Sequence, residues 1–451
     1  MHRLNKWKLH VEGFGKIKEA DIEVGPFTMF TGDNNSGKSY LMTLIWGIRS
    51  NKISEIWASE KDDEILKKIG ELESYKKSKE RIRNFFDVSS KYEDVVLNNA
   101  EVDDFMLLYN DLLKLYKEKF VQQLFRSGIV QVKDINISYK YENKIFISKG
   151  WCKDNIESFI KNSYGKSDIS KKQMDIYVHL FVLRTIFEKL FEGKHVVNTN
   201  VIDAYLPTSR TGFILTYKIL IDSVLRPLMY GKSTNSMNLT LPCMNLIQNI
   251  NWVDNRQNIQ EYSSIVDFME KHISSGKMIL SDNMSTEFYY LPNEKPDTKL
   301  PMKLCSGVVT ETVLLIMFLK HLGLASVSIE EPEMCLHPEL QWQYARVFIK
   351  MYNKGLPICM ATHSDIFMAQ VNNMIKLNNH LEKEILMKEY GYEEDDLISA
   401  EDVKVYHFDV QEDGMTKIIQ IQADEDGFQV PSFQKALKEL LDQSMAFEME
   451  E

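Results

Sequence analysis

The strongest chemical signal in the sequence is a short segment with two glycines and a lysine. Residues 32–39 read GDNNSGKS and match the spacing GxxxxGK[ST]. Glycines let the backbone curl until successive N–H groups point at phosphate oxygens, and a following helix adds its positive N-terminal end. In this spacing Lys38 neutralises the β- and γ-phosphates of a nucleotide, and the Ser39 hydroxyl ligates Mg²⁺. The segment predicts a phosphate-binding loop; a chance glycine-rich turn is the alternative.

A pair of carboxylates supplies the second signal. Residues 325–333 read ASVSIEEPE, so a run of small and apolar residues ends in adjacent acids. A buried strand of this kind delivers acids to a phosphate site. We expect Glu330 to hold Mg²⁺ through water and Glu331 to act as the general base that polarises the attacking water. Taken alone, the same residues also fit a solvated acidic turn before Pro332.

A histidine follows the next expected strand. Residues 359–364 read CMATHS, which places His363 directly after that strand. Ligands of open α/β sheets bind outside the carboxyl ends of the strands. At that edge the imidazole of His363 could donate a hydrogen bond to the γ-phosphate. A surface or core histidine is the alternative.

The elements that must position these residues lie at the two ends of the chain. Near the start, the pattern predicts strands at 7–11, 16–24 and 27–31, and then a helix at 37–48. After Pro301 the pattern predicts a helix at 308–322, a strand at 325–330, a helix at 338–354, and strands at 356–361, 404–410 and 417–423. The simplest organisation is one nucleotide-binding head made from both ends.

The residues between these ends have a different character. Residues 52–128 are rich in Lys and Glu with apolar residues at helical spacing, which predicts several amphipathic helices. The rest of this region predicts a hairpin at 129–150 turning at 142–144, helices at 171–193 and 211–229, and loops at 231–258 and 281–302. A short helix and an acidic tail are expected from Pro431.

Composition narrows the class of protein. The 451 residues are 44% hydrophobic and 26% charged, an ordinary globular composition. The five cysteines form no CxxC pair, which disfavours structural zinc and a secreted disulfide scaffold. The net charge of −11 disfavours a surface that coats DNA. Neither a signal peptide nor an apolar run of ~20 residues is evident, so we expect a cytoplasmic protein with no membrane partner.

Three segments together resemble a known family. GDNNSGKS, SIEEPEMCLHP and MATHSD, in this order, resemble the ATP-binding-cassette-type heads of the SMC and RecF group. They are most similar to OLD-type AAA ATPases of bacterial anti-phage defence, including the ATPase subunits of Septu and PARIS systems. The middle of the chain shares only YLPTSR, at 205–210. The resemblance implies an α/β P-loop NTPase fold with a mixed β-sheet. It divides the chain into a split head at 1–50 and 300–430, a mainly helical insertion at 51–299 for sensing or docking, and a C-terminal helix and acidic tail at 431–451.

The resemblance also implies the site residues. Glu330 and Glu331 match the Walker B acid and the catalytic glutamate, His337 falls in the D-loop, and His363 matches the switch histidine. Ser306 and Gly307, after Leu304 and Cys305, are the candidates for the signature segment that completes a partner's site. Residues implied to contact ATP in its own loop are Gly32, Asn34, Asn35, Ser36, Gly37, Lys38, Ser39 and Tyr40.

Two expectations concern what the chain lacks. A TOPRIM nuclease domain would not fit after the predicted head, and no histidine cluster has the spacing of an HNH centre, so we expect no nuclease centre. The acidic run at 393–396, within YGYEEDD, lacks a strand context and is expected to be a solvated loop.

The leading hypothesis is an ATP-hydrolysing subunit that works with Mg²⁺. It would form a head-to-head homodimer or a higher even-numbered oligomer and gate a separately encoded nuclease or toxin, in response to DNA or a phage protein. Because loops and insertions carry partner specificity, the insertion is the expected docking surface. Two alternatives remain open, namely a DNA-repair or chromosome-maintenance ATPase that binds DNA directly, and a nucleotide sensor that does not hydrolyse ATP.

Overall fold

The chain forms two compact units in the computed structural model. The first comprises Met1–Val24, Thr43–Asp203 and Asn238–Pro242, and the second comprises Gly25–Met42, Ala204–Met237 and Cys243–Glu451. The residues that the structure describes are 6–60, 63–87, 95–140, 145–147, 181–187, 189–191, 201–208, 210–225, 239–253, 258–281 and 287–448.

The second unit contains a mixed sheet whose central strand leads into the glycine-rich segment. β3 (Phe27–Gly32) pairs in parallel with β12 (Ile358–Ala361) on one side and with β13 (Val403–Val410) on the other. β12 also pairs in parallel with β11 (Gly323–Glu330), whereas β13 pairs antiparallel with β14 (Thr416–Ile421). β3 and β12 are buried almost throughout, which is typical of parallel strands covered on both faces.

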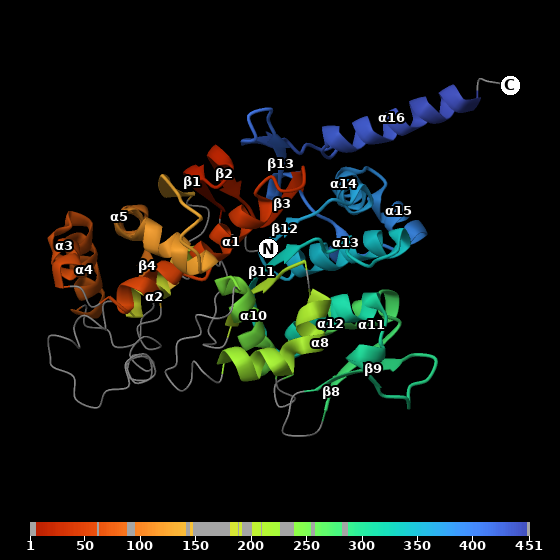
Figure 1. The fold of residues 1–451 in the computed structure, drawn as a ribbon, viewed down its shortest axis with the longest axis horizontal. Helices are drawn as coiled ribbons and strands as arrows, with labels where there is room; N and C mark the ends of the chain where they lie inside the picture. The colour runs from red at the N-terminus through yellow and green to blue at the C-terminus, as the bar shows by residue number, and fades with distance from the viewer. Residues whose placement is uncertain are drawn as a thin grey trace. The chain divides into compact units, whose positions relative to one another are not determined.

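Helices follow several of these strands, as parallel connections require. α1 (Lys38–Arg49) begins in this unit directly after the glycine-rich segment. Figure 1 shows α8 (Arg210–Leu220) beside α12 (Gly307–His321), and the two helices pack together. β7 (Val201–Leu206), through its last residues, extends the strand order beyond β11.

The other elements of the second unit include a small antiparallel sheet in the order β10-β9-β8. Their bounds are η1 (Ile221–Leu225), α10 (Leu241–Trp252), η2 (Gln260–Tyr262), α11 (Ser263–His272), β8 (Gly276–Leu280), β9 (Phe288–Pro292), β10 (Leu300–Pro301), η3 (Met302–Leu304), α13 (Pro338–Asn353), α14 (Asp365–Asn379), α15 (Lys383–Tyr390), η4 (Glu394–Asp396), η5 (Ala400–Asp402) and α16 (Pro431–Glu448).

The first unit is a three-stranded antiparallel sheet with helices. β1 (Lys6–Phe14) pairs with β2 (Ile17–Val24) and with β5 (Asp134–Lys140). α5 (Asn99–Phe125) begins at a capping box in which the side chain of Asn98 accepts from the backbone of Glu101 and the reverse bond also forms. The remaining elements are α2 (Lys52–Ala58), α3 (Asp63–Glu71), α4 (Glu73–Asp87), β4 (Val95–Leu97) and β6 (Ile145–Ile147).

The structure confirms the elements predicted at the two ends of the chain and corrects three predictions in the middle. The hairpin at 129–150 is wrong, because β5 pairs with β1 while β6 pairs with β4; its turn at 142–144 lies outside the described residues. Alternation shows that a segment is a strand but not which strand it joins. The loop predicted at 231–258 contains α10, and that at 281–302 contains β9 and β10.

Three helix predictions fall partly on residues that the structure does not describe. The segment predicted at 171–193 is helical at 181–187 and 189–191, and its other residues lie outside the described chain. The helix predicted at 211–229 is confirmed as α8, which continues as the π-helix η1 to Leu225. The helix from Pro431 is longer than expected and runs to Glu448, and 449–451 of the tail are not described.

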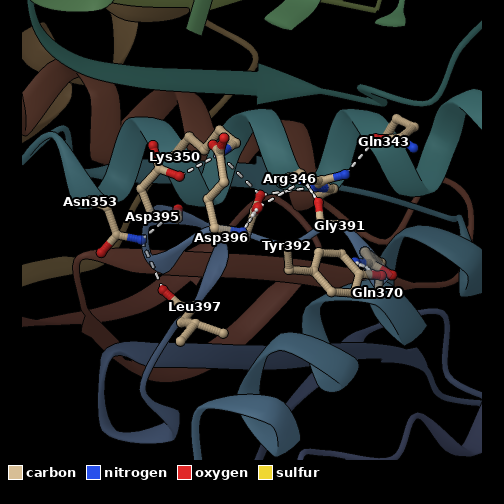
Figure 2. A network of polar contacts seen from close by, with 11 residues as sticks. Gln343, Arg346, Lys350, Asn353, Gln370, Gly391, Tyr392, Asp395, Asp396 and Leu397 are labelled. Carbon is tan, nitrogen blue, oxygen red and sulfur yellow. Dashed lines mark hydrogen bonds and ion pairs between the residues drawn. The ribbon is translucent and has the colours of Figure 1, made fainter. Parts of the chain in front are cut away.

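The acidic run at 393–396 is not the solvated loop expected from the sequence. The carboxylate of Asp396 is fully buried and accepts two hydrogen bonds from Arg346, at 2.9 and 2.8 Å (Figure 2). Lys350, one turn further along α13, pairs with Glu393 at 2.8 Å and with Asp395. Residues four apart share a helix face, so two basic side chains meet the run together. The run is therefore an anchor for α13.

Removing the buried carboxylate should destabilise the second unit. Asp396→Ala leaves the guanidinium of Arg346, which is 8% exposed, without its counter-charge. We expect a loss of about 3–5 kcal/mol in the free energy of unfolding. The double variant Arg346→Met with Asp396→Leu should lose less, because no unpaired charge remains. Glu393→Ala removes an exposed partner and should cost at most about 1 kcal/mol. Denaturant titration measures all three; equal losses for the two single variants would contradict the assignment.

Candidate functional site

The glycine-rich loop is held in place by β13. Gly32 has φ 119°, and a Cβ atom there would collide with the backbone carbonyl of Phe408. The N–H of the next residue, Asp33, donates to that carbonyl at 3.0 Å, and its carboxylate accepts from the N–H of Val410 at 3.0 Å. Only glycine can make so close an approach. Asp33, which sequence reasoning did not single out, therefore fixes the entry of the loop.

The loop curls back on itself around the side chain of Lys38. Asn35 and Gly37 both have positive φ, of 59° and 98°. The ammonium of Lys38 donates to the carbonyl oxygens of Gly32 at 3.1 Å and Asp33 at 2.5 Å. Its side chain is only 7% exposed. The ammonium of Lys38 therefore lies within the curved loop, where it could pair with a phosphate group.

The pKa of Lys38 shows which charges surround it. Burial lowers the pKa, and the carboxylates of Asp33, Glu331 and Glu330 each raise it in return. Both acids predicted from the sequence therefore lie close enough to interact with the predicted lysine. A bound phosphate would add a further negative charge beside the ammonium and so favour its charged form.

Other predicted residues of the loop lie at its surface. Asn34, Asn35 and Ser39 are exposed, Tyr40 is 41% exposed, and Ser36 is buried. The loop is therefore open to solvent on one side, as a site that must admit a nucleotide has to be.

The acidic pair stands at the carboxyl end of β11. The parallel pairing places Glu330 opposite Ala361 on β12, and the N–H of Glu331 donates to the carbonyl of Ala361 at 2.7 Å. Glu331 has φ 43°, a left-handed conformation that non-glycine residues seldom adopt. Such a conformation persists where the surrounding structure imposes it, and it is common at functional sites.

A buried arginine binds the backbone of both acids. Arg210 is 1% exposed, and its guanidinium donates to the carbonyl oxygens of Glu330 at 2.6 Å and Glu331 at 3.0 Å. Its charge is paired with the carboxylate of Glu311 on α12, at 2.9 Å. The sequence showed this arginine only as the last residue of YLPTSR and gave no indication of its partners.

His363 is held by a carboxylate that sequence reasoning missed. Glu333 accepts from the backbone N–H of His363 at 2.6 Å and from the hydroxyl of Thr362 at 2.9 Å. Burial lowers the pKa of His363, and the charge of Lys38 lowers it further. The ring therefore stays neutral to a lower pH than a free histidine. Glu333 is the third acid of the segment EEPE at 330–333, and that third acid was the one sequence signal that could have indicated its role.

The candidate signature segment is exposed at the start of α12. Ser306 and Gly307 both lie at the surface, and Gly307 is next to Cys335, where an added Cβ would meet the Cys335 side chain at 3.1 Å. His337, expected in the D-loop, caps α13 by accepting from the N–H of Glu339 at 3.4 Å.

Among the residues that the structure describes, two further groups have the composition of a metal site. One is His10, Glu12 and Glu19, and the other is the Glu393, Asp395 and Asp396 run that already binds Lys350. In the first group Glu12 is paired with Lys133 at 2.7 Å. The expectation that the chain has no nuclease centre stays a prediction.

The sequence matches the AAA ATPase domain family over residues 7–368, and the chain belongs to this family. The predicted P-loop NTPase fold is thus confirmed, since the family agrees with the mixed sheet and with the loop between β3 and α1. No curated protein matches the chain. Among the described residues, no helix combines the length and apolar character that a membrane span requires.

Solved structures of SMC heads are also similar to the chain. The SMC head bound to the C-winged helix domain of ScpA is 12% identical, with 94% of this chain and 98% of that one covered and a TM-score of 0.37. An SMC head with an extended coiled coil, bound to the C-terminal domain of ScpA derived from Pyrococcus furiosus, is 12% identical (97% and 98% covered, TM-score 0.35). The SMC head domain from Thermotoga maritima is 13% identical (93% and 99% covered, TM-score 0.32). These scores are too low to add to the family assignment.

The interaction between Lys38 and His363 can be tested directly. Lys38→Met should raise the pKa of His363, because the ammonium now lowers it. An NMR titration of histidine-labelled protein measures this pKa, and His363→Gln assigns the resonance. Lys376→Met, at the exposed far end of α14, is the matched control and should leave the pKa unchanged. A pKa that stays the same in Lys38→Met would show that the two side chains do not lie close together.

Proposed function

We propose that this ATPase hydrolyses ATP at the site formed by the loop at 32–39, the acidic pair and His363. The observation that carries the proposal is that the loop, His363 and the acidic pair follow the neighbouring parallel strands β3, β12 and β11. The charges of the acids raise the pKa of Lys38, and Lys38 lowers the pKa of His363, which agrees with this placement. A phosphate chain bound to the loop would therefore lie close to the ammonium of Lys38, the carboxylate of Glu331 and the imidazole of His363.

Each residue has a defined task in this proposal. The N–H groups of the loop and the ammonium of Lys38 hold the β- and γ-phosphates. Glu331 accepts the proton of the attacking water, and neutral His363 donates a hydrogen bond to the γ-phosphate. The bond that forms joins the water oxygen to phosphorus, and the bond that breaks joins phosphorus to the oxygen that bridges the β- and γ-phosphates. The products are ADP and phosphate.

The donor set of the site fits Mg²⁺. The hydroxyl of Ser39 and the carboxylate of Glu330 offer oxygen atoms, which this cation and its bound waters prefer over nitrogen or sulfur. When bound, the cation would neutralise charge on the phosphates. Because Mg²⁺ keeps several waters, Glu330 need only hydrogen-bond to one of them.

A second copy of the chain would complete the site. The loop is open to solvent, so the γ-phosphate would stay wet in a single chain, and catalysis gains from excluding water and adding donors. Ser306 and Gly307 of that copy would supply such donors, because both are exposed at the start of a helix. This gives a head-to-head homodimer with two ATP molecules, or an even-numbered assembly of such dimers.

The biological role that fits best is a cytoplasmic anti-phage defence complex. The support is the likeness of the three motifs to OLD-type ATPases. In this role the ATP state sets the geometry of the dimer, which gates a separately encoded nuclease or toxin. The residues between 50 and 300, which include helices such as α4 with an exposed Lys77 and Lys79, would dock the effector or sense the trigger.

The role of Glu331 is tested by a nearly isosteric change. Glu331→Gln should keep ATP binding and lose hydrolysis by roughly 10²–10⁴-fold, because the amide cannot accept the proton of water. Light scattering with ATP and Mg²⁺ should then show a trapped dimer. The control Lys38→Ala should lose ATP binding in calorimetry, since it removes the phosphate counter-charge. Hydrolysis at the parental rate in Glu331→Gln would remove this residue from the role of base.

The division of labour makes a separate prediction. The purified chain should hydrolyse ATP slowly and should cut neither DNA nor RNA with Mg²⁺ or Mn²⁺. Cleavage or toxicity should need a second protein. Reversing the charge of Lys77 and Lys79 to glutamate should leave ATP hydrolysis near the parental rate and weaken the effector response.

Two outcomes would contradict this division of labour. DNA cleavage by the chain alone, if abolished in an active-site variant, would reveal a nuclease centre within it. Strong stimulation of its ATP hydrolysis by DNA alone would favour the repair-type ATPase over the defence subunit.

A further inference from the structure

Both carboxylate oxygens of Glu330 are already bound by hydroxyl groups of the protein. The phenol of Tyr205 donates to Oε1, and the hydroxyl of Thr208 donates to Oε2 at 3.0 Å. Tyr205 is 3% exposed and stands near the end of β7, and Thr208 lies in the turn before α8. Two donors from one short segment therefore bind both oxygens of the same carboxylate.

The same segment also holds the backbone beneath that carboxylate. Arg210 binds the carbonyl oxygens of Glu330 and Glu331, and its pairing with Glu311 keeps the buried guanidinium in one place. The next residue, Thr211, donates to the Glu311 carboxylate at 2.6 Å. The segment is thus anchored on α12 independently of Glu330. A donor fixed in this way can set the position of its acceptor.

We propose that Tyr205 and Thr208 are positioning residues that orient the Glu330 carboxylate for the divalent cation. This inference rests on the proposed role of Glu330 at the metal. A glutamate has three side-chain torsions to restrain, and one donor on each oxygen restrains the last of them. A carboxylate offers about four lone-pair sites, so two hydroxyl donors still leave sites for a metal-bound water. Groups in the outer shell of a metal site typically contribute 10–100-fold to metal affinity.

A positioning role differs measurably from a merely structural one. If the two hydroxyls only stabilised the fold, their removal would lower the melting temperature and leave metal binding unchanged. If they orient Glu330, their removal weakens the binding of the cation but leaves the cation-independent contacts of the nucleotide intact. Metal affinity and metal-free nucleotide affinity therefore have to be measured on the same variants.

The test compares Tyr205→Phe and Thr208→Val with a matched control. Tyr344→Phe also removes a buried phenol hydroxyl, and within the described structure that hydroxyl has no hydrogen-bond partner. Tyr344 lies close enough to Arg210 and Glu311 for their charges to affect its pKa. Binding of Mn²⁺ is measured by electron paramagnetic resonance on the full chain with a non-hydrolysable ATP analogue. Analogue binding in EDTA is measured by calorimetry.

We expect Tyr205→Phe and Thr208→Val each to weaken Mn²⁺ binding by roughly 10-fold or more. Analogue binding in EDTA should stay within about twofold of the parent, and Tyr344→Phe should match the parent in both measurements. Parental Mn²⁺ affinity in Tyr205→Phe and Thr208→Val would overturn the inference, and so would an equal loss in Tyr344→Phe.

A further variant separates this inference from the function on which it rests. Glu330→Gln keeps the size of the side chain but removes its charge. If Glu330→Gln weakens Mn²⁺ binding while the hydroxyl variants do not, the positioning role fails and the proposed role of Glu330 stands. If Glu330→Gln itself binds Mn²⁺ as the parent does, the proposed metal role of Glu330 fails, and the positioning inference fails with it.

Discussion

The site depends on one buried positive charge. Lys38 is 7% exposed, so its ammonium loses much of its hydration, and such a charge is tolerated only with close partners. Lys38 has two carbonyl oxygens of its own loop and the nearby charges of Asp33, Glu330 and Glu331. The carbonyls are available because Gly32 lies against β13, which turns the chain at that point. The ammonium of Lys38 therefore depends on β13 beside the loop, on the glycine at position 32, and on the three nearby carboxylates.

A second buried charge keeps the acids where Lys38 requires them. The guanidinium of Arg210 binds the backbone of both Glu330 and Glu331 and is neutralised by Glu311. Removing one partner of such a pair leaves an unpaired charge in the interior, which is costly. β11, α8 and α12 consequently meet at one side chain. The left-handed conformation of Glu331 belongs to the same arrangement, since the carbonyl of Glu331 is one of the two acceptors.

The sequence predicted those parts of the site in which spacing along the chain carries the information. The loop around Lys38, the acids after β11 and the histidine after β12 are local patterns, and the structure places them in one charge cluster. The role of Arg210 could not be predicted, because its acceptor, Glu330, is 120 residues away along the chain. No periodicity in the sequence indicates such a contact. The same limit explains the error at Asp396, whose partner is on a different element. Charge alone does not distinguish a solvated carboxylate from a paired one.

Thr211 and Arg210 connect the first turns of α12 to the acidic pair. Gly307 is exposed, whereas Thr310 and Glu311 one turn later are buried and bond to Thr211 at 2.8 and 2.6 Å. The neighbour of Thr211 in the chain, Arg210, holds the carbonyls of both acids. The exposed start of α12 therefore continues, one turn later, into residues that are bonded to the segment beneath Glu330. Because packed interiors resist compression, a displacement there would be passed on rather than absorbed.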